Sequence, residues 1–425
     1  MKFLLINISL FFSVLLSAQT HDINYYFEQA KINSPLINKS KNDNQLIKLD
    51  IQQLKSILSK PQINIEANLL FSPIISHDNG NKFQWVSDGA NDYTGYDLSY
   101  SDGGQYQAFV SVKQPLFTSS RYKIYNQKAD ISSKLNDNNI KLTEHELEQL
   151  ISRQYILCLR AKKQINIASS LTNKINTQIT IIQQLVDNAI YKQTDLMQLQ
   201  IEASNYKIQY QNYKTQYRNN LMDLNLICGI TDTNLIDIQD VNFNLEPDTI
   251  TQSQFLAKFK LDSLSIENEK FIFNQKYKPQ VNLFANAGIN AVYLPSFNRF
   301  GFATGINLVW NIFDGNQKKI MHDKTLIKLQ TIEFEKQNFI SKNKIYKQKY
   351  LTQIKSVKQQ MKMINKQLND YKKLLDLYIY EFSQGQVSIM DYKNLIRDIS
   401  AKKQEYLNLE IQKQILINDY NYWNY

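Results

Sequence analysis

The stretch that decides the fold is residues 354–382, IKSVKQQMKMINKQLNDYKKLLDLYIYEF. Apolar residues recur in it every seven positions, and a second series follows three positions behind the first. The first series is Ile354, Met361, Leu368, Leu375 and Phe382, and the second is Val357, Ile364, Tyr371 and Tyr378. This heptad seam predicts a long helix that packs side by side with another helix.

The same seam occurs a second time, 196 residues earlier in the chain. Only Thr172 is polar among the nine equivalent positions, Cys158, Ala161, Ile165, Ala168, Thr172, Ile175, Ile179, Ile182 and Val186. The separation from Phe117 to Asp195 is 78 residues, and the separation from Phe313 to Asp391 is also 78. A repeat of this length predicts two copies of one large structural unit.

Composition and termini narrow the class of protein. With 11 Gly and 7 Pro in 425 residues, the chain favours long helices with few turns. Residues 1–19 have the pattern of a secretory signal: a lysine, an apolar run and a small-residue cleavage site. No later stretch approaches the ~20 apolar residues that a membrane helix needs. If the protein meets a membrane, we therefore expect it to do so with strands.

The net charge of +10 comes from lysines scattered along helix faces, which favours solvated surfaces over a nucleic-acid partner. Cys158 and Cys228 are too few for a disulfide scaffold. We favour two buried free thiols, because Cys158 occupies a seam position. A bridge stays open as an alternative, since a hairpin that turns near Lys192 would bring both cysteines to a similar height.

Strand and helix patterns alternate in the same order in both copies. We predict a signal peptide at 1–19, a first repeat at 20–229, a linker at 230–250 and a second repeat at 251–425. The first repeat has a helix over 22–59 that is broken or kinked at Pro35, a strand pair within 61–117 and a helical hairpin over 119–228. The second has a helix over 251–277, a strand pair within 279–313 and a hairpin over 315–423.

The loop between the first two strands is rich in glycine and aspartate, which raises the question of calcium. Its spacing matches no EF-hand, so we predict no metal there. The aspartates are Asp78, Asp88, Asp92, Asp97 and Asp102.

The four strands are each near ten residues long, the length of a tilted strand that crosses a bilayer. One side of each is apolar and the other is mostly Asn, Gln, Ser and Gly. Four strands cannot cross a membrane alone, because open sheet edges are not tolerated in lipid. Three copies would close a barrel of twelve strands, whereas eight strands would leave a filled interior. A soluble sheet with one solvated face is the alternative.

At this point the chain resembles the TolC-like outer membrane efflux proteins. The carrying motifs are Gln114-Pro115-Leu116-Phe117, then Trp310-Asn311-Ile312-Phe313-Asp314-Gly315, then Phe382-Ser383-Gln384-Gly385 followed by Asp391. The resemblance implies a mainly α fold with a homotrimeric, twelve-stranded transmembrane β-barrel and an α-helical tunnel through the periplasm. It also implies an outer membrane location and, as partners, a periplasmic adaptor and an inner-membrane transporter.

The resemblance further implies a periplasmic entrance that closes near the second turn. Asp391 falls at the first acidic position of the family, whereas the second is Asn394 here. Phe382 stands where a gating tyrosine can occur, and Asp195 is the counterpart of Asp391 in the first copy. Helix capping is the alternative role for both aspartates, and core packing is the alternative for Phe382.

The tips of the two hairpins would contact the adaptor. The predicted contact residues are Gly385, Gln386, Val387, Ala189, Ile190 and Tyr191. Val387 stands where the family can have an arginine link, so that link is missing.

Catalysis finds no support in the sequence. The four histidines are isolated, without partners at metal or triad spacing; they are His21, His77, His145 and His322. The sequence also has no glycine loop of the kind that holds a phosphate. We therefore predict a passive export duct without cofactor or metal. The alternative is a soluble periplasmic coiled-coil adaptor, which would have one hairpin rather than two.

Overall fold

The computed structural model describes residues 20–71, 75–76, 93–94, 104–234, 236–247, 253–291, 300–384 and 386–425. The predicted signal peptide and the five loop aspartates lie outside these residues. Among the helices that are described, none is both long and apolar enough to cross a membrane. The elements are α1 (Ile23–Asn33), α2 (Pro35–Ser59), β1 (Gln62–Phe71), β2 (Ile75–Ser76), β3 (Tyr93–Thr94), β4 (Gly104–Leu116), α3 (Ser119–Asp187), α4 (Gln193–Ile227), α5 (Gln254–Asn274), the 3₁₀ helix η3 (Gln275–Tyr277), β5 (Gln280–Ala291), β6 (Phe300–Val309), α6 (Gln317–Ser383) and α7 (Ile389–Tyr422).

The predicted break at Pro35 separates α1 from α2. Proline has no backbone N–H, so it is tolerated at the first position of a helix but not inside one. Ser34 links the two helices. Its N–H bonds the carbonyl of Ala30 at 2.8 Å, and its hydroxyl accepts from the N–H of Ile37 at 3.4 Å. One helix therefore ends and the next begins at a single residue.

The chain forms two compact units, and each takes segments from both repeats. The sheet unit comprises Asn42–Asp137 and Lys258–Glu335. The helical unit comprises the chain up to Lys41, together with Asn138–Ala257 and Lys336–Tyr425.

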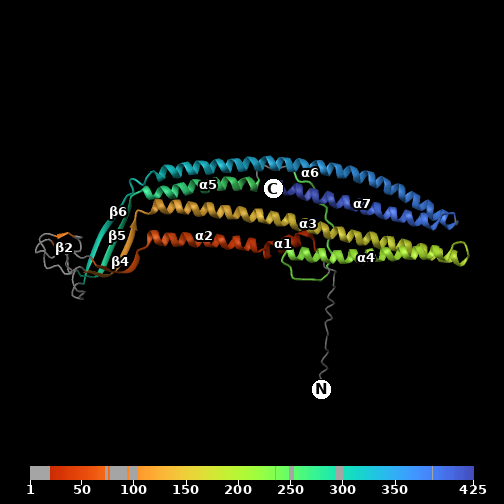
Figure 1. Ribbon diagram of the computed structural model, residues 1–425, viewed down its shortest axis with the longest axis horizontal. Coiled ribbons are helices and arrows are strands. Elements are labelled where there is room, and N and C mark those ends of the chain that lie inside the picture. Colours follow the sequence, from red (N-terminus) through yellow and green to blue (C-terminus); the bar gives the residue numbers. More distant parts are fainter. Residues whose placement is uncertain are drawn as a thin grey trace, which may run out of the picture. The chain divides into compact units, whose positions relative to one another are not determined.

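The sheet unit holds a four-stranded antiparallel sheet in the order β1-β4-β5-β6 (Figure 1). Ile65 pairs with Val110, Val110 with Ala287, and Ala287 with Phe302, so these four side chains share one face. The period of two along each strand makes most of this face apolar, with Gln114 and Thr304 as polar exceptions. The pairing of Asn64 with Ser111 and of Ser111 with Asn286 places polar side chains on the opposite face.

Two phenylalanines interrupt the polar face of the sheet. Phe284 lies over Gly305 on the neighbouring strand, where an added Cβ would come within 2.8 Å of its ring. Gly288 pairs with Phe109, and an added Cβ there would come within 2.4 Å of the Phe109 Cα. The two glycines therefore leave room for the close approach of these strands and rings.

The helices of the sheet unit lie side by side in the order α6, α5, α3, α2 (Figure 1). Polar contacts join each pair of neighbours. Lys270 Nζ on α5 contacts His322 Nδ1 on α6 at 2.7 Å, and Asn268 Nδ2 on α5 donates to the Ile124 carbonyl on α3 at 3.4 Å. Asn44 Nδ2 on α2 donates to Asp137 Oδ1 on α3 at 2.6 Å.

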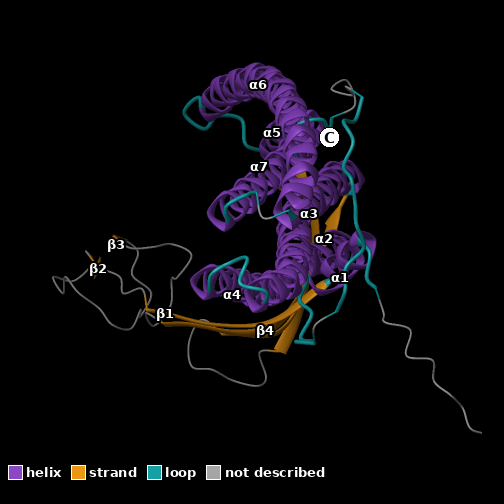
Figure 2. Ribbon diagram, turned by 90° about the vertical axis from the view of Figure 1, so that its right-hand side faces the viewer, coloured by secondary structure: helices purple, strands orange, loops and turns teal. Residues whose placement is uncertain are grey.

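The helical unit contains α1 and the ends of two long hairpins, in which the later part of α3 turns back into α4 and the later part of α6 turns back into α7 (Figure 2). Within the first, Asn220 Nδ2 donates to the Leu157 carbonyl at 3.1 Å. Between the two, Lys163 of α3 forms an ion pair with Glu410 of α7 at 2.8 Å.

The heptad seam is the buried side of α6, as predicted. Ile354, Val357, Ile364 and Leu375 are buried, and the other described seam residues are half-buried. Ile354 and Val357 pack against Leu416 and Ile417 of α7. The equivalent positions of α3 are also buried or half-buried throughout. The side chain of Phe382 lies outside the described residues.

Cys158 and Cys228 are both free and fully buried, which confirms the favoured reading. They belong to a core that also contains Tyr26, Tyr155 and Tyr217. Burial raises the pKa of each thiol to about 12. Because a buried, protonated thiol is a poor nucleophile, both cysteines serve as packing groups.

Candidate functional site

The candidate site is the pair of turns at the hairpin ends. In the first turn, Ala189 adopts a left-handed conformation with φ of 60°. Its N–H bonds the Val186 carbonyl at 2.9 Å, and the Ile190 N–H bonds the Leu185 carbonyl at 2.8 Å. These bonds form a Schellman motif, which usually has glycine at the left-handed position. Alanine there costs about 1 kcal/mol in backbone strain.

The described part of the second turn repeats this geometry. The N–H of Gln386 bonds the carbonyl of Glu381 at 3.0 Å, the counterpart of the bond from Ile190 to Leu185. Gly385, which corresponds to Ala189, lies outside the described residues. The two turns thus share the same backbone closure, and the repeat extends to the ends of the hairpins.

The two aspartates that follow the turns differ in their surroundings. Asp195 caps α4, because its Oδ2 accepts from the N–H of Lys192 at 3.2 Å while its own N–H bonds the Lys192 carbonyl at 3.0 Å. The cap of α7 is instead Ser388, whose Oγ accepts from the Met390 N–H at 3.1 Å. Asp391 is exposed, and the hydrogen bonds found among the described residues do not include its carboxylate. A capping hydrogen bond is therefore present for Asp195, whereas Asp391 lies in the first turn of α7, where the helix dipole favours a negative charge.

Asn394 lies three residues after Asp391 and is also exposed, so both project from one side of α7. Arg397 continues this exposed side. The structure therefore brings together a carboxylate, an amide and a guanidinium in the first three turns of α7.

The predicted contact residues at the tips separate into exposed and buried groups. Ile190 is 57% exposed, and Ala189 and Gln386 are also exposed. Val387 is buried in a core with Leu196, Leu375 and Tyr392, so its side chain is not available to a partner in this structure. Tyr191 is half-buried beside the same core.

Polar contacts join the two hairpins near their ends. The Tyr191 hydroxyl donates to the Val387 carbonyl at 2.9 Å. About three helical turns further in, Arg397 Nε of α7 lies 3.9 Å from Glu202 Oε1 of α4. The Glu202 side chain is only 12% exposed, whereas Arg397 is 61% exposed. We call these two contacts the inter-hairpin links.

A buried tyrosine lies beside the second link. Tyr206 of α4 faces Ser400 and Glu202, and burial raises its pKa to about 12. Burial also raises the pKa of Tyr191, and the negative charge of the nearby Asp195 raises it further. Both hydroxyls therefore keep their protons at neutral pH and can donate hydrogen bonds.

Sequence reasoning missed Glu202, Tyr206, Arg397 and Ser400. No local motif marks them, since a charged or polar residue on a long amphipathic helix is usually solvated. Tyr191 was singled out as a contact residue, but its bond to Val387 was not foreseen.

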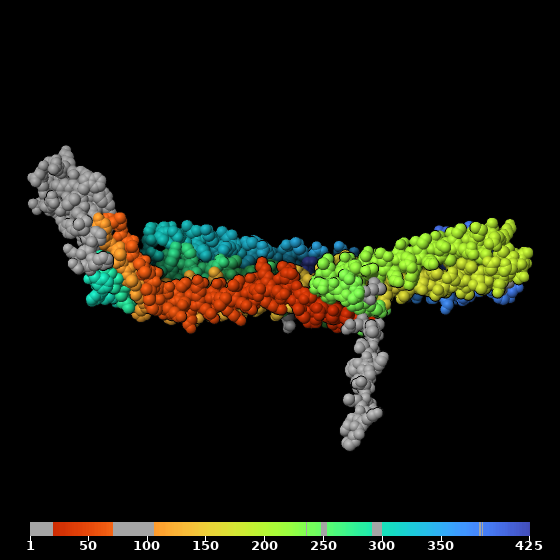
Figure 3. Space-filling view, turned by 90° about the horizontal axis from the view of Figure 1, so that it is seen from below, coloured from red at the N-terminus to blue at the C-terminus, as the bar shows by residue number. Residues whose placement is uncertain are grey.

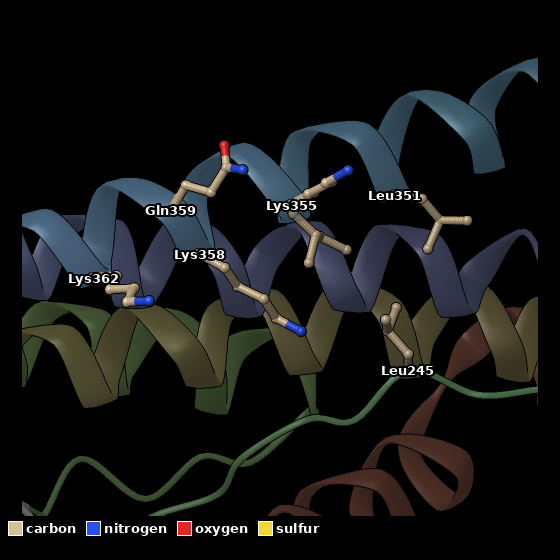
Figure 4. A pocket seen from close by; sticks show the side chains of 7 residues that line it. Leu245, Leu351, Lys355, Lys358, Gln359 and Lys362 are labelled. Carbon is tan, nitrogen blue, oxygen red and sulfur yellow. The ribbon is translucent and has the colours of Figure 1, made fainter.

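A second feature of the helical unit is a shallow hollow of about 420 Å³ beside α6 (Figure 4). Leu245 of the linker and Leu351 of α6 supply its apolar lining, and Lys355, Lys358 and Lys362 stand along α6. No cluster of His, Cys, Asp or Glu in the described part of the chain could hold a metal ion.

Comparison with known proteins identifies the fold. CusC matches with a TM-score of 0.70 at 14% identity, over 95% of this chain and 92% of the other; its report concerns folding and transmembrane channel formation. The outer membrane protein VceC of Vibrio cholerae matches with a TM-score of 0.68 at 11% identity, over 95% and 96%. The outer membrane channel CmeC of Campylobacter jejuni matches with a TM-score of 0.65 at 12% identity, over 94% and 85%.

No family profile and no curated protein matches the sequence. The likeness is thus one of structure, and it covers nearly the whole length of these channels. The resemblance to TolC-like outer membrane efflux proteins is confirmed at the level of the fold: long helical hairpins joined to a small antiparallel sheet.

Proposed function

We propose that the chain is one subunit of a homotrimeric outer membrane export duct that serves an efflux or type I secretion system. The duct is passive and has no catalytic centre; energy comes from a transporter in the inner membrane. The observation that carries the proposal is a two-faced sheet with two open edges, attached to long hairpins in a fold shared with outer membrane channels.

The two faces of the sheet suit lipid on one side and water on the other. On the apolar face, Ile65 is 84% exposed, Phe302 is 87% exposed and Ile306 is 68% exposed. Exposure of a whole sheet face of this kind is unfavourable in water but favourable against acyl chains. The face rich in Asn and Gln would line the lumen.

The open edges suit closure between copies. β1 and β6 are the edge strands, and each has a row of backbone groups without partners in the sheet. Lipid does not tolerate such edges, so β6 of one copy would pair with β1 of the next. Three copies give twelve strands and an open lumen, whereas two would give a filled barrel.

Apolar side chains are exposed on the outermost helices of the sheet unit. Leu46 and Leu49 of α2 are each 56% exposed, and the surface of α2 is uncovered in Figure 3. Ile327 and Phe334 of α6 are 63% and 74% exposed. The two surfaces differ, so their contact would be head to tail, which closes a ring.

The helical unit repeats this arrangement on its own outer helices. Ile201 and Ile208 of α4 are 60% and 59% exposed, and Ile345 and Met363 of α6 are 67% and 61% exposed. The same head-to-tail contact would cover them and continue the ring as a tunnel of twelve helices.

The hairpin ends would form the periplasmic entrance. We assign Asp391 and Asn394 to the pore, together with Phe382, and we assign Asp195 to the cap of α4. The exposed tip residues Ile190, Ala189 and Gln386 would meet the periplasmic adaptor, with Gly385 in the same turn. The inter-hairpin links would hold the entrance closed.

The test is the oligomer mass of the purified protein in detergent, followed by single-channel recording in a planar bilayer. We expect a trimer with small, mostly closed conductance that rises in the Tyr191→Phe variant. A monomer that stays soluble without detergent and shows no channel activity would instead favour the coiled-coil adaptor.

A further inference from the structure

The chain passes from β6 into α6 through residues 310–316, which we call the second junction; the passage from β4 into α3 is the first. The second junction gathers exposed apolar and basic side chains around a hollow of about 580 Å³. Trp310, Ile312 and Phe313 line it and are 59%, 82% and 80% exposed. Lys318 and Lys319, in the first turn of α6, line the same hollow. The junction therefore offers an apolar shelf beside two cations.

Asp314 is the acidic residue that lines this hollow, and groups of the protein itself pair with its carboxylate. Its Oδ2 lies 2.9 Å from Lys276 Nζ and also accepts from the Tyr277 hydroxyl. Its Oδ1 accepts from the Gln317 N–H at 3.1 Å. Asp314 thus caps α6 and neutralises Lys276, which leaves the cations of α6 for another partner.

Lys318 and Lys319 have no carboxylate partner within the described part of the chain. Lys318 Nζ lies 5.5 Å from the centroid of the Tyr277 ring, a cation–π contact that involves no carboxylate. Lys319 is exposed.

Side-chain hydrogen bonds and a sharp turn of the backbone keep the apolar shelf next to the two lysines. Trp310 Nε1 donates to the Tyr277 carbonyl at 3.1 Å, and Asn311 Nδ2 donates to the Lys276 carbonyl at 3.2 Å. Gly315 and Asn316 have φ of 69° and 66°, so the chain turns sharply from the end of β6 into α6. The side chains on either side of this turn therefore face one hollow.

We propose that this junction binds the headgroup of an anionic phospholipid, in the leaflet that meets the helical end of the sheet. The proposal rests on the membrane function proposed above. Trp310 follows Leu308 by two residues and continues the alternation of the apolar face, and tryptophan favours the interface between acyl chains and water. Lys318 and Lys319 then lie where the lipid phosphate is expected, and their charge complements it.

The first junction lacks this arrangement, although it also exposes a phenylalanine. Phe117 is 86% exposed, like its counterpart Phe313. The residues equivalent to Lys318 and Lys319 are Tyr122 and Lys123, preceded by Arg121, and Ser120 accepts from Lys278 Nζ at 2.9 Å. The proposal places the lipid site at the second junction because two adjacent lysines there line one hollow with the exposed aromatic side chains.

The experiment is native mass spectrometry of the intact protein in detergent, titrated with phosphatidylglycerol or phosphatidylcholine. The wild type is expected to bind phosphatidylglycerol preferentially. The double variant Lys318→Gln/Lys319→Gln should weaken this binding by about 30-fold, since each lysine near an anionic surface contributes roughly a factor of five. Lys318→Arg/Lys319→Arg should restore it.

The matched control is Lys355→Gln/Lys358→Gln, which removes two exposed lysines of α6 beside the hollow of Figure 4. It should leave phosphatidylglycerol binding unchanged. Equal loss in this control, no lipid preference in the wild type, or displacement of lipid by inorganic phosphate at equal concentration would each overturn the site. Because channel activity in phosphatidylcholine bilayers is recorded on the same samples, failure of the lipid site is distinguished from failure of the duct itself.

Discussion

The hydroxyl of Tyr191 donates to the carbonyl of Val387, and these two residues occupy the same position in the two repeats, 196 residues apart. One repeat supplies a side chain and the other a backbone group. The duplicated hairpins are thus joined at their ends by an asymmetric hydrogen bond, in addition to the core that they share around Leu375 and Tyr392.

Tyr191→Phe removes this bond and keeps the ring in place. A hydrogen bond of this kind contributes about 1 kcal/mol, which corresponds to about a fivefold change in the ratio of open to closed entrance. Single-channel recording should show the open fraction rise by that factor. Ile190→Ala, at an exposed neighbouring position, is the control and should not alter it.

The ion pair of Glu202 and Arg397 should stabilise the closed entrance less than the Tyr191 hydrogen bond does. Removing only one of its partners should nevertheless cost more, because the other charge then loses its partner. Arg397→Ala strands a mostly buried carboxylate, so we expect it to open the entrance more than Glu202→Gln does. A double-mutant cycle on the open fraction should give a coupling of about 0.5–1 kcal/mol. Additive effects of the two variants would show that the residues do not interact.

Asp195 and Asp391 should respond differently to substitution. Asp195→Ala removes a helix cap and should destabilise the end of α4 by about 1 kcal/mol, measured by hydrogen exchange. Asp391→Ala should leave that exchange unchanged but lessen block of the channel by divalent cations. Equal effects of both variants on cation block would contradict the assignment of a pore role to Asp391 and not to Asp195.

The two faces of β6 give a sharp test of the barrel. Ile306→Asp places a charge on the proposed lipid face, closer to the middle of β6, and should weaken insertion, at a cost below the ~2–4 kcal/mol of a lysine or arginine at mid-membrane. Asn307→Asp places the same charge on the proposed lumen face of the adjacent position and should insert normally. Insertion is measured by heat-modifiable migration and by recovery in the outer membrane fraction.

His145 predicts a pH dependence in the helical unit. Its ring stacks on Tyr425 at 4.0 Å and on Tyr422 at 5.1 Å, and its Nε2 donates to the Tyr422 carbonyl at 2.9 Å. Burial lowers its pKa, although the Tyr422 carbonyl and the carboxylates of Glu148, Glu246 and Glu146 act in the opposite direction.

Protonation therefore favours the unfolded chain. As pH falls below about 6.5, the usual histidine value, the unfolded chain takes up a proton that the folded chain does not, and stability declines until the lower folded pKa is passed. His145→Gln should remove this part of the acid sensitivity in denaturant titrations. A variant as sensitive as the wild type over pH 5–7 would contradict the role of His145.

Much of the fold could be predicted from periodicity because two long-range patterns constrain it. The heptad seam around Ile354 identifies the buried side of α6, and alternation around Ile306 identifies the two faces of β6. Proline marks where helices end, because Pro35 cannot donate a backbone bond. The order of the strands was not predicted, since pairing of β4 with β5 joins the two repeats and has no local signal.

The site was less predictable. The role of Asp195 as a cap could be anticipated from its place after a turn, whereas the link from Glu202 to Arg397 depends on how two hairpins pack. Val387 was expected at the surface of the hairpin tip, but its side chain is buried. It packs in the core with Tyr392, because an apolar side chain directly after the turn can reach that residue. Three-dimensional neighbours of this kind leave no trace in the spacing of a single sequence.

The seam also limits how the length of the protein can change in evolution. Insertion of one or two residues into α6 would rotate every later seam side chain out of the core, whereas insertion of a whole heptad keeps the packing. A heptad added to one hairpin alone would carry Tyr191 away from Val387 by about 10 Å. Descendants of this chain that span a different distance should therefore carry matched insertions, in multiples of seven, in both arms of both repeats.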